Sequence, residues 1–351
     1  MQENKKKNPL SLQLDVSDFL PANAQEKESL VVMRESVNFF RDGLRRLRKN
    51  KVAMVSFFII IFALLFAFVG PAVYPYSYEQ QIRTSVNLAP LEYSAKELQT
   101  IHDGGKVFPH ILGTDRLGRD LMVRLMMGCR ISLLVGIVAS ALILLIGSVY
   151  GAVAGYFGGK VDMVMMRFVD IIYTVPDILI IILLMVTLKY PLQSLADRVK
   201  GFAWINTLGV GLICIFVVFA LLYWVGMARI VRGQILALKE QEFVTAARAL
   251  GASHGRIIRK HLLTNCMGAL IVTTTLQIPS SIFVESFLSF IGIGVAAPLP
   301  SLGSMASDAI GGITSYPHRL LAPAITISLV ILSFNLFGDG LRDAFDPKLK
   351  N

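Results

Sequence analysis

Six long apolar stretches constrain the fold of this chain more than any other feature. A bilayer core about 30 Å thick needs around 20 consecutive apolar residues per helix, and six stretches of the 351 residues reach that length. They are residues 52–70, 131–157, 168–188, 201–228, 262–294 and 320–338. With 54% of the residues hydrophobic and 17% charged, the composition excludes an ordinary water-soluble domain. The sequence therefore predicts an all-α, polytopic integral membrane protein with six transmembrane helices.

The distribution of positive charge predicts the orientation of these helices. The net charge is +10, which could indicate a nucleic-acid partner. However, an N-terminus on the cytoplasmic side places 23 of the 34 Lys and Arg residues inside and 11 outside, as the positive-inside rule requires. Both termini and the loop at residues 229–262 are then cytoplasmic, and nucleic acid is not an expected partner. Four arginines of the first outer loop oppose this trend: Arg116, Arg119, Arg124 and Arg130.

The remaining segments follow from this topology. Residues 1–27 are polar and predicted to be a disordered cytoplasmic tail. Residues 28–51 carry an apolar stripe and a basic end, which predicts an amphipathic helix on the inner leaflet; a partner-binding helix is the alternative. Beyond it we expect a first transmembrane helix at 52–73, an extracytoplasmic loop at 74–130, a core with five transmembrane helices at 131–338 and a cytoplasmic tail at 339–351.

A polar segment between the fourth and fifth apolar stretches reads as two short helices around a bend. Phe243, Ala246 and Leu250 recur at helical spacing, Gly251 is a typical helix stop, and Ser253 is placed to cap a second helix. Ala246, Ala247 and Gly251 would let another backbone approach closely. The segment is therefore either a docking surface for a partner or a plain connector lying on the membrane.

The second apolar stretch carries a glycine stripe. Gly147, Gly151, Gly155 and Gly159 recur at intervals of four residues, so they lie on one side of a helix. Without side chains, this side can approach another helix closely, and dispersion then favours association in lipid. We expect a face for packing against a helix or a subunit, rather than a flexible helix with incidental glycines.

Three acidic residues lie within apolar stretches. Asp170 and Asp177 are seven residues apart in the third stretch, hence on one face of a continuous helix, and Glu285 lies in the fifth. Intramembrane acids are costly and seldom face lipid. They could line a translocation path, or they could be structural, with Asp170 paired to Arg167 and Glu285 hydrogen-bonded to a neighbouring helix.

No pattern of a catalytic, metal or cofactor site is visible. Asp115 and Asp120 have no partner base nearby, so a structural turn that pairs Asp with Arg is favoured. Three cysteines, at Cys129, Cys214 and Cys266, imply neither a disulfide framework nor a metal site. The five histidines are scattered, and no G-x-x-x-x-G-K-[ST] motif for ATP is present.

Several runs together resemble one family. The polar segment is similar to the loop of binding-protein-dependent ABC importer permeases, with Ala246, Ala247, Gly251 and Leu263 at matching positions and Glu242 as a usual companion. Thr245, His261 and Thr264 depart from that pattern. The runs HILGTDRLGRD, GYFGGKVDMVMMRFVDIIYTVP, ESFLSFIGIG and GDGLRDAFDP resemble the C-type permease subunit of oligopeptide and dipeptide importers, although Leu302 stands where that family often has Trp.

The resemblance implies the type I ABC importer permease architecture in a bacterial inner membrane. It implies a homologous B-type permease as the other half of the pore, two cytoplasmic ATPases and an extracytoplasmic substrate-binding protein. Residues 242–251 would be the helix that couples to the ATPases, and the chain itself would not hydrolyse ATP. Peptides are the expected substrates, with nickel chelates or other small solutes as the alternative. A secondary transporter that binds its coupling ion at Asp170, Asp177 and Glu285 is a third possibility.

Overall fold

The computed structural model describes residues 39–345, and within that range the chain is helical with one isolated antiparallel bridge between Thr114 and Asp120. Six helical segments there are long and apolar enough to cross a membrane. They are α3 (Lys51–Phe68), α6 (Leu121–Phe157), α8 (Asp177–Arg198), α10 to α11 (Val210–Leu238), α15 (Met267–Phe290) and α17 (His318–Phe345). The predicted all-α membrane fold with six spans is confirmed.

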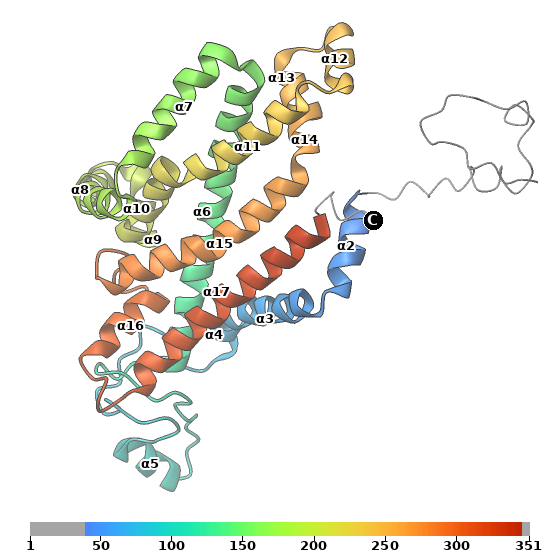
Figure 1. Ribbon diagram of the computed structural model, residues 1–351. Coiled ribbons are helices and arrows are strands. Elements are labelled where there is room, and N and C mark those ends of the chain that lie inside the picture. The colour runs from blue at the N-terminus through green and yellow to red at the C-terminus, as the bar shows by residue number, and fades with distance from the viewer. Residues whose placement is uncertain (1–38, 346–351) are drawn as a thin grey trace, which may run out of the picture.

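Shorter elements connect and extend these spans (Figure 1). They are α2 (Phe39–Lys49), α4 (Gly70–Val73), α5 (Ala95–His102), α7 (Gly159–Thr174), η2 (Lys200–Phe202), α9 (Trp204–Leu208), α12 (Glu242–Ala249), α13 (His254–Arg256), α14 (Leu263–Asn265) and α16 (Leu302–Ile310). Two π-helical turns interrupt the fourth span and precede the fifth, η3 (Phe219–Tyr223) and η4 (Ile257–Leu262). The short helix α12 lies at one end of the bundle and α5 at the other; we call these the α12 end and the α5 end (Figure 1).

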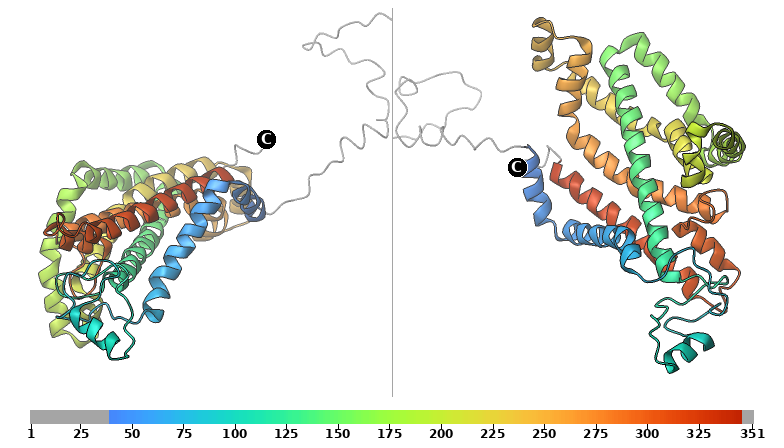
Figure 2. Two further views of the ribbon diagram at one scale, coloured as in Figure 1. Left: turned by 90° about the horizontal axis from the view of Figure 1, so that it is seen from below. Right: turned by 180° about the vertical axis from the view of Figure 1, so that it is seen from behind.

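Helix α6 is the central element of the bundle. It begins where the Asp120 side chain accepts a hydrogen bond from the Val123 amide, and it ends at Gly158, whose φ of +63° suits glycine. The largest buried cluster joins α6 to α8, α10 and α11, and a second cluster joins α6 to α3, α16 and α17. Figure 2 shows α6 running through the molecule from the loop beside α5 to α7.

The third span differs from its prediction over residues 168–188. Helix α7 ends at Thr174, Val175 is extended with φ −93° and ψ 137°, and α8 starts after Pro176. The proline ring disfavours helical backbone at the preceding residue, so the chain breaks there. Asp170 and Asp177 consequently lie on two different helices, and the inference that they share one helix face was wrong.

Several other predicted boundaries also moved; for example, α6 starts at Leu121 rather than at residue 131, and α8 ends at Arg198 rather than at residue 188. The fourth span starts at Val210 rather than at residue 201, because Gly209 has φ +86° and separates α9 from α10. Helix α17 continues to Phe345, beyond the predicted boundary at residue 338. The tail predicted for residues 1–27 lies outside the described residues. Of the predicted helix at 28–51, the described part forms α2, which ends before Asn50, the residue that caps α3.

Candidate partner surface and transport face

The polar segment after α11 forms a compact hairpin at the α12 end. Helix α12 stops where the Leu250 amide donates to the Ala246 carbonyl at 3.0 Å, and the Ala252 amide donates to the Ala247 carbonyl at 3.0 Å. Gly251 between them has φ +80°, a conformation that side-chain-bearing residues rarely adopt. The bend at Gly251 is therefore present as predicted. Ser253 precedes α13, but its side chain makes no capping hydrogen bond.

Helix α12 presents one apolar side to solvent. Val244 and Ala247 are buried against the hairpin, whereas Phe243, Ala246 and Leu250 are exposed, Leu250 by 88%. We call these three exposed residues the α12 patch. The patch forms one side of an open groove of about 1140 Å³, whose lining also includes the basic side chains of Arg256, Arg259 and Lys260.

Of the five residues predicted to couple to a partner, some lie at the exposed surface of the hairpin and others are buried or partly buried. Ala246 and the helix stop Gly251 are on or beside the α12 patch, and Glu242 is exposed in the first turn of α12. Ala247 faces inward. Leu263 lies in α14, partly buried against the main core cluster. Phe243 and Leu250, which the family pattern did not mark, contribute the largest apolar side chains of the patch.

The hairpin is held to the bundle through α6 and α11. Tyr156, near the end of α6, forms a 2.8 Å hydrogen bond between its hydroxyl and Nδ1 of His254. Helix α11 leads directly into α12, and its Arg232 binds both carboxylate oxygens of Asp162 on α7 at 2.5 Å. These contacts link the hairpin to α6, and they link α11, which leads into α12, to α7.

Three of the four stripe glycines lie where α6 packs against α11. A Cβ added at Gly147 would lie 2.6 Å from Cβ of Met227, one at Gly151 would lie 2.3 Å from the Ala228 carbonyl oxygen, and one at Gly155 would lie 3.0 Å from the Arg232 carbonyl oxygen. Only glycine permits such close backbone approach. Gly159 lies beyond the end of α6 and has φ +53° with no atom within 4 Å of an added Cβ.

A row of three cavities runs along the polar side of α15. Their volumes are about 790, 600 and 430 Å³, and Ser280 lines all three. Gln277 is shared by the first two, and Asp177 and Tyr223 by the last two. We call this continuous set of openings the cavity face.

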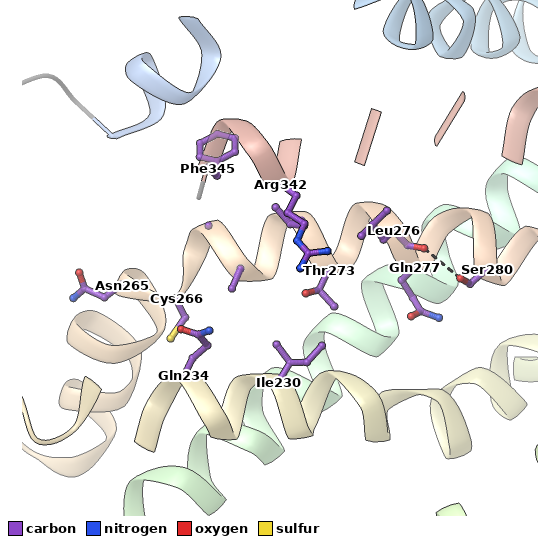
Figure 3. A pocket seen from close by; sticks show the side chains of 13 residues that line it. Ile230, Gln234, Asn265, Cys266, Thr273, Leu276, Gln277, Ser280, Arg342 and Phe345 are labelled. Carbon is purple, nitrogen blue, oxygen red and sulfur yellow. Dashed lines mark hydrogen bonds between the residues drawn. The ribbon is translucent and has the colours of Figure 1, made fainter. Parts of the chain in front are cut away.

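The first cavity opens between α11, α15 and α17 (Figure 3). Thr273 and Gln277 project into it from α15, Gln234 from α11, and Arg342 reaches it from the last turns of α17 (Figure 3). Amide, hydroxyl and guanidinium groups on otherwise apolar helices can exchange hydrogen bonds with a polar solute, which is how ligand cavities fix polar groups.

The acidic residues have different surroundings. Asp177 begins α8 and lines two of the cavities. Asp170 is bound instead by Arg229 of α11, whose Nη2 lies 2.9 Å from its Oδ1. The predicted ion pair between Asp170 and Arg167 was therefore wrong, because the Asp170 carboxylate faces α11. Arg229 also lies over the ring of Tyr173, 4.5 Å from its centroid.

Glu285 is enclosed rather than exposed to a cavity. Its residue exposure is 0%, and its carboxylate accepts hydrogen bonds from Ser132 at 2.7 Å and Ser289 at 2.8 Å. Ser132 belongs to α6, so this contact ties α6 to α15. The arrangement matches the structural alternative, a hydrogen bond to a neighbouring helix.

The loop at the α5 end has a polar core of its own. His110 is fully buried, with Nδ1 2.7 Å from Asp120 and Nε2 3.3 Å from Glu97, and its ring stacks on Tyr76. Burial disfavours the imidazolium, but the hydrogen bonds and charges of Asp120 and Glu97 outweigh burial and raise the pKa of His110. Burial likewise opposes ionisation of Glu97, yet the hydrogen bonds that its carboxylate accepts lower its pKa.

Asp115 is paired with arginine, as the sequence predicted. Its Oδ2 accepts from Arg119 Nε at 2.7 Å and from Arg124 Nη1 at 2.5 Å. Burial opposes its charged form, but the backbone amides of Arg119 and Leu117 and the two guanidinium charges prevail and lower the pKa of Asp115. Within residues 39–345, Asp120 forms no ion pair with an arginine; it caps α6 and binds His110. Among residues 39–345, no three His, Cys, Asp or Glu side chains are grouped closely enough to hold a metal ion.

Comparison with known proteins matches this architecture. Residues 143–351 fit the model of the family described as "Binding-protein-dependent transport system inner membrane component", a range that covers the second part of α6, the α12 hairpin and the cavity face. The chain belongs to this family. Residues 38–90 of this permease also fit the model of the N-terminal transmembrane domain of oligopeptide transport permease C.

Curated relatives of the permease are similar over nearly their whole length. It is 44% identical to the dipeptide transport system permease protein DppC of Bacillus subtilis (strain 168), over 95% of this chain and 93% of that protein. It is 40% identical to the oligopeptide transport system permease protein OppC of the same strain, over 95% and 97% of the two chains. To OppC of Escherichia coli (strain K12) it is 36% identical, over 90% and 93%.

Proposed function

We propose that this permease forms one half of the translocation pore of an ATP-driven importer for oligopeptides or dipeptides. Its partners would be a homologous B-type permease, two cytoplasmic ATPases and an extracytoplasmic substrate-binding protein. The substrate class comes from the names of the relatives. The α12 end would face the cytoplasm, as the excess of Lys and Arg on that side favours.

The α12 patch is the observation that carries this proposal. An exposed leucine and phenylalanine on a short helix, flanked by a basic groove, form a small apolar anchor with a charged rim, which is the usual composition of a protein interface. Helix α12 is also joined by a three-residue turn to α11, which lines the cavity face. A partner that pulls on α12 would therefore act on a wall of the transport path.

The cavity face would form this chain's part of that path, to be closed by the B-type subunit. A peptide in transit offers amide groups along its length and an ammonium and a carboxylate at its ends. Gln277, Ser280 and Thr273 could exchange hydrogen bonds with the amides. Asp177 and Arg342, in different cavities of the row, carry the charges that complement the two ends. Asp170, paired with Arg229, and the enclosed Glu285 would shape the path without contacting peptide.

Copurification tests the coupling surface. Wild type, Leu250→Glu and the control Thr245→Glu would be tagged, purified in mild detergent and examined for bound subunits. Leu250, the C-cap of α12, is the most exposed residue of the patch, whereas Thr245 is an exposed residue on another side of α12, so both variants add the same charge to the hairpin. We expect the ATPases with wild type and Thr245→Glu, and their loss with Leu250→Glu.

An ATPase content that is equal in all three preparations would refute the role of the α12 patch. A wild-type chain that purifies alone and transports without ATPases would instead favour the ion-coupled carrier. If the ATPases copurify as expected, uptake of labelled dipeptide, longer peptide and nickel chelate into cells that lack other importers would identify the substrate.

A further inference from the structure

Four arginines converge at the α5 end of the bundle, around a cavity of about 20 Å³. Arg116, Arg119 and Arg124 come from the loop and the first turn of α6, and Arg319 comes from the start of α17. Two carboxylates face them, Asp115 and Asp308. The group, which we call the arginine cluster, therefore carries two more positive than negative charges. Most of these arginines are the ones that oppose the positive-inside trend.

Asp115 is already saturated within this cluster. Its two oxygens accept from the side chains of Arg119 and Arg124 and from the backbone amides of Leu117 and Arg119, at 2.5 to 3.0 Å. This half of the cluster is a completed structural contact that fixes the start of α6. It has no capacity left for the remaining arginine charges.

Asp308 is the second carboxylate among the residues that line the cavity, and three arginines share it without a short hydrogen bond. Arg116, Arg119 and Arg124 approach its carboxylate at 3.5, 3.6 and 3.3 Å, all longer than the 2.7–2.9 Å of a good charged hydrogen bond. Its side chain is 42% exposed and that of Arg116 63% exposed, so this half of the cluster opens to solvent.

Arg319 supplies a further unsatisfied donor. The residue is more than nine-tenths buried and lines the cavity, and its Nη2 donates to Asn87 at 2.8 Å. Its Nε, however, has no hydrogen-bond partner. A buried donor without a partner loses the free energy of its hydration. The cavity beside it holds about one water-sized group.

We propose that the arginine cluster is a docking contact that receives an acidic side chain of the extracytoplasmic binding protein. This inference rests on the proposed function, which places the α5 end outside the membrane. One incoming carboxylate can accept hydrogen bonds from the guanidinium of Arg116. Arg119, Arg124 and Arg319, which line the same cavity, would add favourable charge around it. Guanidinium groups are suited to such two-point recognition of a carboxylate.

The position of the cluster favours a protein partner over the transported peptide. Its lining residues come from the loop, α6, α16 and the start of α17, and none of them lines the three cavities of the cavity face. A peptide bound in those three cavities would therefore not contact the cluster. The small cavity also admits only the tip of a side chain, which a folded protein surface can present.

Stimulation of ATP hydrolysis by the binding protein measures this contact. The complete transporter would be assayed with increasing concentrations of substrate-loaded binding protein, for wild type, Arg116→Glu, Asp308→Asn and Lys96→Glu. Lys96 is an exposed cation of the same loop outside the cluster, so Lys96→Glu makes the same change of charge as Arg116→Glu. Basal ATPase activity without binding protein should be the same in all four.

We expect Arg116→Glu to raise the half-maximal concentration of binding protein by about tenfold, since loss of an interfacial charge contact weakens association. Asp308→Asn should lower it, because a competing carboxylate is neutralised. A Glu→Arg or Asp→Arg substitution on the binding protein should restore docking to Arg116→Glu. Equal shifts for Arg116→Glu and Lys96→Glu, or no shift for Arg116→Glu, would overturn the inference while leaving the proposed function intact. A wild-type complex without ATPase stimulation would overturn both.

Discussion

Substituting Gly151 by alanine tests how closely α6 and α11 approach. The added Cβ would lie 2.3 Å from the Ala228 carbonyl oxygen and 3.0 Å from its carbonyl carbon, whereas ordinary contacts begin at 3.4 Å. The helices must therefore separate by about 1.1 Å at this point, the difference between 3.4 and 2.3 Å. A gap of that size forfeits about a quarter to a half of the dispersion energy of the neighbouring contacts.

Overpacking of this kind costs about 1–3 kcal/mol, while replacing a helical glycine by alanine returns about 0.5–1 kcal/mol of backbone entropy. We expect Gly151→Ala to lower the free energy of unfolding by about 0.5–2 kcal/mol, the difference between the low ends and between the high ends of these two ranges. Unfolding would be followed by helical circular dichroism during titration of mixed micelles with a denaturing detergent.

Gly233→Ala on α11 is the matched control. An added Cβ there meets no atom within 4 Å, so only the helix-propensity gain remains. This variant should be as stable as wild type or more stable by up to about 1 kcal/mol. If Gly151→Ala proves as stable as Gly233→Ala, the two helices do not pack at the distance described.

Three further predictions concern the buried and acidic groups. The pKa of His110 is raised from 6.5, so the contribution of His110 to loop stability is complete below pH 6.5 and is lost as pH rises through the folded pKa. The pKa of Glu97 is lowered from 4.5, so the contribution of Glu97 is complete above pH 4.5 and is lost as pH falls through the folded pKa. The protection factors of the loop amides, meaning intrinsic divided by observed exchange rates, should therefore be highest between pH 4.5 and 6.5, and His110→Ala should abolish their increase as pH falls toward 6.5. Glu285→Ala should lower the free energy of unfolding by about 1–3 kcal/mol because buried serine hydroxyls lose their acceptor. Glu285→Gln keeps an acceptor oxygen and should cost less. Equal losses for the two variants in the detergent titration would contradict the structural role of Glu285. Asp177→Asn should slow peptide uptake more than Asp170→Asn does, at equal amounts of assembled transporter, and the reverse order would remove Asp177 from the path.

The sequence predicted those features that depend on local composition. Six apolar runs were enough to locate the spans, since length and hydropathy alone decide whether a helix can cross a bilayer. The bend at Gly251 followed from the conformational freedom of one residue. The break before Asp177 could also have been predicted, because Pro176 was visible and restricts Val175.

Other features depend on which helices become neighbours, and no local pattern contains that information. Asp170 binds Arg229, 59 positions along the chain, rather than the arginine three positions away. The polar residues of the cavity face are uncharged, so the charged groups of the apolar stretches do not point to them. Thr273, Gln277 and Ser280 recur at intervals of four and three residues within an apolar span, and this spacing could have identified them as one helix side.

The length of α6 has a mechanical consequence. At 37 residues it is about 55 Å long, far more than the hydrocarbon core that it crosses, and it is a single α-helix throughout. One end is anchored by Asp120 in the loop beside the arginine cluster, and the other by Tyr156 against the hairpin that carries α12. Such a rod acts as a lever: a tilt of about 5° about its midpoint would move its two ends by about 2 Å in opposite directions. A movement at the α5 end would in this way reach the α12 end through rigid geometry, without a relay of side-chain rearrangements.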